Sequence, residues 1–261
     1  MQIIVCVKQV PDTAEVKISP ETNTLIREGI PSIINPFDLH ALEEGLRLRE
    51  KHGGAVTVLT MGPPQAKEAL REALALGSDR AVLLSDRAFA GADTLATSYT
   101  LARAVEKIGY DVILCGRQAI DGDTAQVGPG IAEHLGIPHV TCIRSLAVTE
   151  MGRFRVERMT DDGYETLDVE GPALFTVIRE INTPRLPSLR GMMRAKKANF
   201  EPWTAATIDA DPERIGLQGS PTGVVRIFNP PLPEGKGEIW RGSSEENTAR
   251  LIALLRDRKI I

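Results

Sequence analysis

The sequence has little of several features that would assign it to a common class of protein. No apolar run in its 261 residues approaches the roughly 20 residues that a membrane-spanning helix needs. Aromatic residues make up only 4% of the chain, which argues against a surface that stacks nucleic-acid bases. The net charge is −4, so no overall positive field attracts nucleic acid or an anionic membrane. We therefore expect neither nucleic-acid binding nor direct membrane insertion.

Cysteine and histidine are also scarce, and their spacing fits no metal site or disulfide framework. Cys6, Cys115 and Cys142 lie far apart in apolar runs and form no Cys-x-x-Cys pair. The four histidines form no ligand motif. Buried core positions are therefore the expected role of the cysteines. Residues 1–7 lack the basic start, length and cleavage site of a signal peptide, so we expect a cytoplasmic chain without a metal centre.

The first 140 or so residues instead contain a regular alternation of two patterns. Strand-like apolar runs occupy residues 3–7, 56–60, 81–84 and 112–115. Residues 37–51, 64–76 and 93–108 carry apolar side chains at helical spacing. Strands that alternate with amphipathic helices are typical of βαβ units, whose parallel sheet is covered on both faces. The sequence therefore predicts an α/β fold with a doubly wound, mostly parallel, Rossmann-like sheet.

After residue 140 the pattern changes. Short strand-like runs at 140–148, 153–158, 165–169 and 173–178 are separated by turn signals, and we interpret them as antiparallel strands that extend or flank the sheet. Residues 182–242 are rich in proline and resemble an extended arm, before a final helix that Ser243 and Glu246 are spaced to cap. We predict an α/β nucleotide-binding domain at 1–181, a separate segment at 182–197, and an arm with a helix at 198–261.

A glycine-rich segment, GRQAIDGDTAQVGPG at 116–130, lies between a strand-like run and the helix-like residues 131–136. Helix N-termini favour anions, and glycine lets the backbone approach a phosphate closely. Asp123 or Thr124 can cap this helix, or Thr124 can donate its hydroxyl to a phosphate oxygen. The segment matches neither of the common phosphate-binding motifs. An ordinary glycine-rich connection therefore remains an alternative to an anion or nucleotide site.

Four blocks carry a resemblance to a known family. They are VCVKQVPD at 5–12, NPFD at 35–38, GRQAID at 116–121, and PRLPSLRGMMRAKK at 184–197. With these blocks in this order and spacing, the sequence resembles the β subunit of electron transfer flavoproteins over essentially its whole length. The resemblance implies an obligate heterodimer with an α subunit that carries its own FAD. It also implies an adenine nucleotide in the β subunit.

The family has two branches, and the loop after residue 120 separates them. In the branch that only shuttles electrons, the β-subunit nucleotide is AMP, a structural filler. In the electron-bifurcating branch it is a second FAD, which takes hydride from NADH. One electron then goes through the α-subunit FAD to a high-potential acceptor, and one goes to a low-potential ferredoxin or flavodoxin. The AMP branch typically carries an acidic triplet, a small residue and then Asn-Gln.

Here Gly122 interrupts the acidic triplet, and Ala125 stands where the AMP branch has asparagine. This version resembles the FAD-containing members, because smaller residues leave room for a longer ligand. We therefore expect a bifurcating, FAD-containing β subunit, with an AMP-binding shuttle as the alternative. A regulatory or ligase-like nucleotide-binding domain would instead need an SGGxDS-type loop, which the sequence lacks.

The resemblance implies that nucleotide contacts come from four segments. They are Cys6, Val7 and Lys8; Asn35, Pro36, Phe37 and Asp38; Met61; and Gly116, Ala119, Asp121, Gly122, Asp123, Thr124, Ala125, Gln126 and Val127. We expect no catalytic residue, because the cofactor performs the chemistry and the protein positions it. For Lys8, charge balance for the ligand and a solvated strand-end lysine both remain open. Asp121 and Asp123 are expected to cap or to bind ribose.

The last block resembles the family's recognition loop for a partner dehydrogenase, either an acyl-CoA dehydrogenase or another. Leu189 matches the anchoring leucine, with Arg190, Met193 and Lys196 beside it. An exposed apolar anchor rimmed by charge suits a transient contact that electrostatics steers. Pro184 and Pro187 are expected to hold this loop extended. The alternative is a solvated basic stretch without a partner.

Overall fold

The computed structural model describes residues 1–12, 32–150, 152–225 and 237–261. Two compact units are present, Met1–Arg226 and Ile227–Ile261. The expected boundaries at 181/182 and 197/198 both fall inside the first unit. Ile208 and Ile215 are buried in its core, so residues 198–225 belong to this unit rather than to an arm. Residues 226–236 of the expected arm lie outside the described residues.

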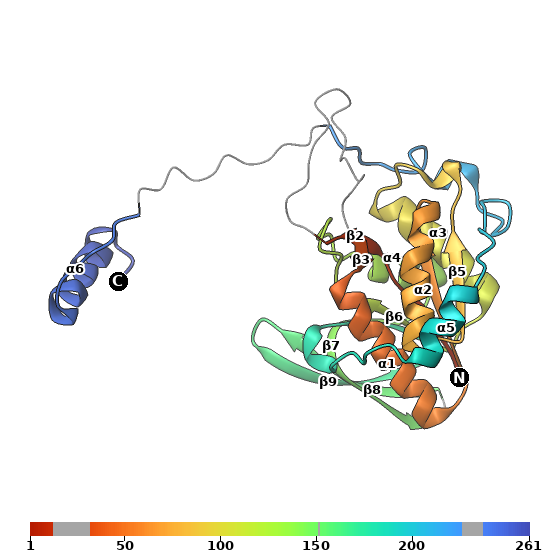
Figure 1. Cartoon of the computed structure of the whole chain (residues 1–261), viewed down its shortest axis with the longest axis horizontal. Helices are drawn as coiled ribbons and strands as arrows, with labels where there is room; N and C mark the ends of the chain where they lie inside the picture. The colour runs from red at the N-terminus through yellow and green to blue at the C-terminus, as the bar shows by residue number, and fades with distance from the viewer. Residues whose placement is uncertain (13–31, 151, 226–236) are drawn as a thin grey trace. The chain divides into compact units, whose positions relative to one another are not determined.

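The first unit is built on an eight-stranded sheet in the order β5-β4-β1-β6-β10-β7-β8-β9 (Figure 1). The strands are β1 (Gln2–Cys6), β4 (Ala55–Met61), β5 (Arg80–Leu84), β6 (Val112–Gly116), β7 (His139–Glu150), β8 (Arg153–Thr160), β9 (Gly163–Glu170) and β10 (Ala173–Val177). A separate antiparallel pair joins β2 (Gln9–Pro11) to β3 (Ser32–Ile34). The sheet is parallel from β5 to β7, and the pairs β7–β8 and β8–β9 are antiparallel.

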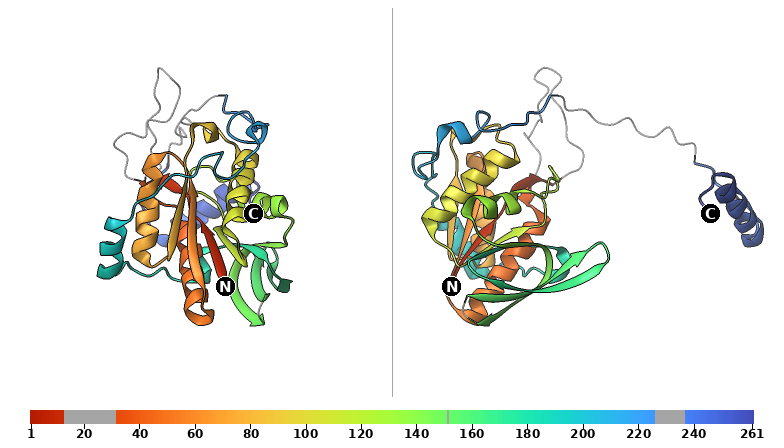
Figure 2. Two further views of the ribbon diagram at one scale, coloured as in Figure 1. Left: turned by 90° about the vertical axis from the view of Figure 1, so that its right-hand side faces the viewer. Right: turned by 180° about the vertical axis from the view of Figure 1, so that it is seen from behind.

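Helices cover both faces of this sheet (Figure 2). The unit contains α1 (Pro36–His52), α2 (Lys67–Leu76), α3 (Thr94–Ile108), α4 (Val127–Leu135) and α5 (Leu189–Lys197). Short 3-10 turns occupy Pro64–Ala66, Arg87–Phe89, Arg179–Ile181 and Pro212–Arg214. In β1, Ile3 and Val5 join the core of α1 and α2, whereas Ile4 and Cys6 join that of α3 and α4. The prediction of a doubly wound, mostly parallel sheet is confirmed.

The prediction that residues 173–178 extend the sheet as an antiparallel strand is wrong. Strand β10 inserts between β6 and β7 and runs parallel to both. All five of its residues are buried, as expected for a central strand covered on two faces. Phe175 of β10 packs edge-to-face on Phe154, with ring centroids 5.4 Å apart. The antiparallel extension therefore consists of β8 and β9 alone, paired through β7.

The prediction that residues 182–197 stay extended is also wrong in its second half. Residues 189–197 form helix α5, in which the Ser188 side chain accepts a hydrogen bond from the Gly191 N–H and so caps the first turn. Ala195 is buried against Leu74 and Ala75 of α2. Burial of Ala195 on α2 therefore stabilises a nine-residue helix whose own apolar side chains, Leu189, Met192 and Met193, remain exposed.

Residues 198–225 run over the first unit and cover an open edge of the sheet. Trp203 forms an isolated parallel bridge with Leu84 of β5, and its N–H donates to the Leu83 carbonyl at 2.8 Å. The Trp203 ring also lies under the Arg80 guanidinium, 5.6 Å from its carbon. Covering β5 in this way protects an edge that would otherwise offer unpaired backbone groups to another strand.

The second unit contains helix α6 (Ser244–Asp257). The predicted capping box is confirmed, because Ser243 and Glu246 exchange side-chain and backbone hydrogen bonds. None of the residues of α6 is buried, and Leu251 and Ile252 are exposed. Across the described residues of both units, no helix has the length and apolar character to cross a membrane.

Candidate functional site

The site lies where the winding of the sheet reverses, beyond the carboxyl ends of β1 and β6. In open α/β sheets ligands bind at this switch point. Cys6 of β1 and Cys115 of β6 are opposite each other in register, and both are buried as predicted; Cys142 is half-buried. Met61 ends β4, the neighbour of β1 on its other side. The carboxyl ends of β4, β1 and β6 therefore lie side by side.

Asp38, in the first turn of α1, joins two of these strand ends. Its carboxylate accepts hydrogen bonds from the Lys8 N–H at 2.8 Å and the Gly116 N–H at 3.1 Å. Burial raises the pKa of Asp38 to about 7, although these hydrogen bonds oppose the shift. Position 116 requires glycine, because a Cβ there would lie 2.3 Å from Asp38 Oδ1 and 2.7 Å from Phe37. The expected residues of α1 and β6 are thus in direct contact.

Asn35, which is buried before α1, fixes the loop that follows β6. Its Nδ2 donates to the Gln118 carbonyl at 2.8 Å, and its Oδ1 accepts from the Ile120 N–H at 3.1 Å. Two hydrogen bonds from one side chain therefore hold residues 118–120 against the start of α1. The sequence analysis missed Gln118 and Ile120; their only signal was their position inside the GRQAID block.

Lys8 has a partner that neither expectation for it anticipated. Its ammonium forms an ion pair with Asp121 Oδ1 at 2.7 Å, and both side chains are partly exposed. Exposed ion pairs contribute little free energy, about 0–1 kcal/mol. The geometric consequence is larger, because the pair ties the loop after β6 to the end of β1. Asp121 is thereby committed to Lys8 rather than to a helix cap.

The middle of the loop has an unusual backbone. Asp123 has φ of 50° and Ala125 has φ of 55°, a region that residues other than glycine rarely adopt. Gln126 follows with φ −109° and ψ −4°. A change of sign in φ between successive residues is the geometry of an anion-binding nest. Within the described chain, the backbone N–H groups of residues 124–126 donate to no protein acceptor.

The prediction that Asp123 or Thr124 caps α4 is wrong. The N-cap is Gln126, and it makes no side-chain capping bond. The Asp123 carboxylate instead accepts a hydrogen bond from Gln118 Nε2 at 2.7 Å, because the left-handed backbone at Asp123 separates it from the helix start. The first N–H groups of α4 therefore keep no side-chain acceptor of their own.

The glycines of this segment have two different roles. A Cβ at Gly128 would lie 2.7 Å from Thr176 Cγ2, and one at Gly130 would lie 2.7 Å from Ser98 Oγ. These two glycines let α4 pack closely on β10 and α3. A Cβ at Gly122 would meet nothing within 4 Å, so that position opens onto free space. Only the first part of the glycine-rich segment is thus available to a ligand.

This arrangement fits a phosphate-containing ligand. The nest at residues 125–126 suits a phosphate, the open position at Gly122 leaves room beside it, and buried Asn35 and Asp38 hold the surrounding loops in place. Among the described residues no group of three or more histidine, cysteine, aspartate or glutamate side chains could hold a metal ion.

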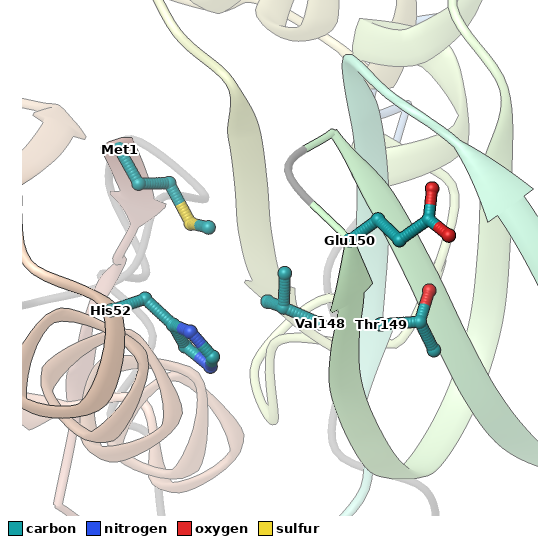
Figure 3. Close-up of a pocket in the computed structure, with 5 residues that line it drawn as sticks. All are labelled: Met1, His52, Val148, Thr149 and Glu150. Carbon is teal, nitrogen blue, oxygen red and sulfur yellow. The ribbon is translucent and has the colours of Figure 1, made fainter.

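A separate open cavity of about 260 Å³ is lined by Met1, His52, Val148, Thr149 and Glu150 (Figure 3). Met1 precedes β1 and His52 ends α1. The cavity therefore lies near the amino end of β1, whereas Lys8 and Gly116 lie at the carboxyl ends of β1 and β6. It is distinct from the site described above.

The expected partner-recognition residues are not part of the nucleotide site. Leu189, Arg190, Met193 and Lys196 lie on α5, which packs beside α2 (Figure 1). The side chains of Leu189 and Met193 are 77% and 65% exposed. Leu186, which the sequence analysis did not name, is 89% exposed; its neighbour Leu189 was the only signal for it. Helix α5 packs against the last turn of α2, which leads into the start of β5. Helix α5 therefore lies toward the amino ends of the parallel strands, away from the site.

The fold defines a doubly wound α/β domain, and the candidate ligand site lies at the switch point of its sheet. A family model described as the electron transfer flavoprotein domain matches residues 22–208. The chain is 54% identical to an electron transfer flavoprotein subunit beta of Thermoanaerobacterium thermosaccharolyticum, with 100% of both chains covered. The chain belongs to the electron transfer flavoprotein β-subunit family, which implies an α-subunit partner.

Two further relatives carry different names. Subunit CarD of the caffeyl-CoA reductase-Etf complex of Acetobacterium woodii is 49% identical, with 100% of both chains covered. Protein FixA of Azorhizobium caulinodans is 50% identical, with 97% of this chain and 93% of that protein covered. The family resemblance carried by the four sequence blocks is confirmed.

Proposed function

We propose that this chain is the FAD-binding β subunit of an electron-bifurcating flavoprotein. In the proposal it accepts hydride from NADH in the cytoplasm. One electron passes through the FAD of the α subunit to a high-potential acceptor, and the other to a low-potential ferredoxin or flavodoxin. When bound, FAD supplies the chemistry that converts a two-electron donor into one-electron transfers. The residues of this chain bind and orient it.

The observation that carries the proposal is the backbone of Ala125. Ala125 has φ of 55°. This backbone conformation costs alanine at least about 1 kcal/mol relative to glycine, and asparagine tolerates it better than alanine does. Members that bind AMP are expected to carry asparagine at this position. The retention of a strained alanine is explained if the position must stay small beside a ligand longer than AMP.

Other described contacts support the same assignment. Gly122, which interrupts the expected acidic triplet, faces open space. The N–H groups of residues 124–126 have no acceptor within the described chain and would face the pyrophosphate. Asn35 and the Lys8–Asp121 ion pair hold the loop on either side of this nest. The alternative, an AMP-binding shuttle subunit, uses the same phosphate contacts but does not require Ala125 to be small.

The partners of the proposed function follow from the family and from one relative's name. The α subunit completes the heterodimer. We propose an acyl-CoA dehydrogenase as the high-potential partner, because the name of CarD places that relative in a complex with a CoA-ester reductase. Leu189, Arg190, Met193 and Lys196 of α5 would contact this dehydrogenase, since their side chains lie on an exposed surface that combines apolar and basic groups.

Cofactor stoichiometry tests the proposal. The chain is co-expressed with its α subunit, the heterodimer is denatured, and the released FAD and AMP are quantified. We expect two FAD and no AMP per heterodimer. One FAD and one AMP would contradict the proposal and leave all redox chemistry in the α subunit.

Two substitutions at residue 125 sharpen this test. Ala125→Asn suits the left-handed backbone but adds volume, so we expect it to lower the FAD content toward one per heterodimer. Ala125→Gly relieves the strain and adds nothing, so it is the matched control and should retain two FAD. Equal FAD content in the two variants would contradict the role assigned to the small side chain.

A further inference from the structure

The segment that leads into α5 runs along α1 with one contact per turn of the helix. The Arg179 guanidinium lies over the Phe37 ring, 5.0 Å from its centroid. Three residues later, Asn182 Nδ2 donates to the His40 carbonyl and to Glu44 Oε2, each at 3.0 Å. Successive contacts thus advance in the same direction along both segments, so the register between them is defined.

Three residues further on, Arg185 reaches Glu43, a carboxylate that is only 4% exposed. Glu43 accepts hydrogen bonds from Arg185 at its Nε (2.8 Å), its backbone N–H (3.2 Å) and its Nη2 (3.3 Å). Arg47 Nε adds a fourth at 2.7 Å. Burial opposes ionisation, but these hydrogen bonds outweigh it and hold the pKa of Glu43 below its ordinary value.

The outer side of Arg185 is held as well. Its Nη1 and Nη2 donate to the two carboxylate oxygens of Glu50 at 2.5 and 3.0 Å. The Arg185 guanidinium is therefore hydrogen-bonded to the buried carboxylate of Glu43 and to the exposed carboxylate of Glu50, both on α1. A planar fork held in this way has little rotational freedom. Arg185 is four residues before Leu189, so its side-chain and backbone hydrogen bonds hold the chain shortly before α5 begins.

Stability alone does not account for this cluster. Replacing a buried ion pair by apolar residues of similar size is often neutral or stabilising, whereas removing one partner leaves the other charge buried without a counter-charge. A buried carboxylate that accepts four hydrogen bonds, three of them from Arg185, instead defines a single geometry. Here that geometry concerns the segment that carries the exposed side chains of Leu186 and Leu189.

The other end of α5 is fixed to α2. Arg71 Nη1 donates to the Ala195 carbonyl at 2.9 Å, and Arg194 Nη2 donates to the Leu74 carbonyl at 3.0 Å. At Gly191 a Cβ would lie 2.1 Å from the Ala75 carbonyl oxygen. The segment before the helix is thus held by α1 and the helix itself by α2, and its apolar side chains stay exposed.

We propose that Glu43 is a positioning residue for partner docking: through Arg185 it fixes the approach to α5 and so presents Leu186 and Leu189 in one orientation. This inference rests on the proposed function, because it takes the exposed face of α5 as the surface that a dehydrogenase contacts. Glu43 itself does not touch the partner. Its effect reaches the docking surface through the Arg185 fork.

Amide hydrogen exchange of the intact heterodimer tests the positioning role without any partner. Glu43→Gln keeps the shape of the side chain and removes its charge, and Arg185→Lys keeps the charge and removes the fork. For both we expect about tenfold faster exchange in peptides covering 186–197, because local opening becomes easier. Peptides from β1, β4 and β6 should be unchanged.

The matched control is Asp168→Asn, which breaks another bidentate pair, with Arg155, on the ribbon of β8 and β9. It should leave exchange in 186–197 unchanged. Glu50→Gln removes only the ion pair between Arg185 and the exposed carboxylate, so it should give a smaller increase in the exchange rate of residues 186–197. Unchanged exchange in 186–197, or faster exchange throughout the sheet, would overturn the positioning role.

Electron transfer to a purified acyl-CoA dehydrogenase that accepts electrons from the wild-type heterodimer tests the consequence for docking. In Glu43→Gln we expect the KM for the dehydrogenase to rise about fivefold to tenfold with little change in kcat. A substitution has this effect when it weakens binding of the partner equally in the ground state and the transition state. Arg185→Lys should rescue part of the loss that Arg185→Ala causes. An unchanged KM overturns the inference.

The two proposals fail in different ways. A wild-type heterodimer that contains AMP contradicts the proposed FAD chemistry, but the KM experiment still decides the role of Glu43. Faster exchange in Glu43→Gln with an unchanged KM shows that the cluster orders α5 but that docking does not use it. That result overturns the inference and leaves the cofactor assignment intact.

Discussion

Asp38 is the buried titratable side chain that connects the strand ends of the nucleotide site. Its two oxygens accept the backbone N–H groups of Lys8 and Gly116, so no other residue type of similar size satisfies both donors. An asparagine side chain would point its NH₂ group at one of these two backbone N–H groups, and two donors cannot form a hydrogen bond with each other. An unpaired buried polar group of this kind costs about 1–3 kcal/mol. The identity of residue 38 therefore follows from backbone geometry as much as from any contact with the ligand.

The raised pKa of Asp38 predicts how stability changes with pH. Its pKa is about 7 in the folded chain and near the ordinary 3.8 when unfolded. Between these values the folded state holds a proton that the unfolded state has released. The free energy of unfolding should therefore fall as pH rises from about 4 to about 7, and this contribution should be constant above that range. The expected total is of the order of a few kcal/mol.

Thermal unfolding of the heterodimer between pH 4.5 and 8 measures this effect. Asp38→Asn should be less stable at low pH and should lack the decline that wild type shows. Asp168→Asn is the control; its pKa is held below the ordinary value by Arg155, so the decline through this window should persist. Parallel profiles for wild type and Asp38→Asn would contradict the assignment.

At the scale of elements, the packing of α4 depends on Gly128. Gly128→Ala brings a methyl group within 2.7 Å of Thr176 Cγ2 on β10, so we expect a loss of about 1–3 kcal/mol in stability. Gly122→Ala is the control, because its Cβ meets nothing within 4 Å; it should stay within about 0.5 kcal/mol of wild type. Denaturant unfolding of the heterodimer at fixed protein concentration compares them.

A double variant separates steric clash from other causes. Thr176→Ser removes the Cγ2 methyl but keeps the hydroxyl, which accepts a hydrogen bond from the Cys142 N–H at 3.1 Å. Gly128→Ala with Thr176→Ser should therefore recover much of the loss, as a coupling between the two positions. Strictly additive effects of the two substitutions would mean that the clash is not the cause.

Most elements were predictable because their signals are local. The periodicity of residues 37–51 and 93–108 predicts α1 and α3, and Ser243 with Glu246 predicts the start of α6. The pairing of β10 was not, because an apolar five-residue strand does not specify its neighbours. Helix α5 was missed because its stability comes from Ala195 and the arginine contacts with α2, which the sequence of α5 does not reveal.

The candidate site shows the same division. The blocks at 35–38 and 116–121 were identified, but the hydrogen bond between Asn35 and Gln118 joins residues 83 positions apart. The strained φ of Ala125 likewise had no signal in the sequence, since alanine is typical of helices. The helical pattern of residues 37–51 carries no signal for Glu43; only the path of residues 179–185 along α1 makes it a buried partner.

At the scale of the whole first unit, α1 connects two functional regions. It begins at Asn35 and Asp38, at the carboxyl ends of β1 and β6, and its later turns carry Glu43 and Glu50, which hold the approach to α5. The candidate ligand site thus lies at the start of this helix, and its middle and last turns hold the segment that leads into the proposed docking surface on α5.

The docking surface itself is tested by Leu189→Ala. This side chain is 77% exposed, so its truncation should change the stability by no more than about 0.5 kcal/mol. As an apolar anchor in an interface it should contribute about 1–2 kcal/mol to binding, which raises the KM for the dehydrogenase roughly fivefold to thirtyfold. Cofactor content and heterodimer assembly should match wild type.

Leu217→Ala is the matched control for this substitution, because Leu217 is also exposed, at 68%, but packs beside Gly91 away from α5. Its KM should equal that of wild type. If Leu189→Ala and Leu217→Ala transfer electrons with the same KM, the dehydrogenase does not use the face of α5. If only Leu189→Ala is impaired, and Glu43→Gln is impaired in the same parameter, then the anchor and the helix that positions it act as one docking unit.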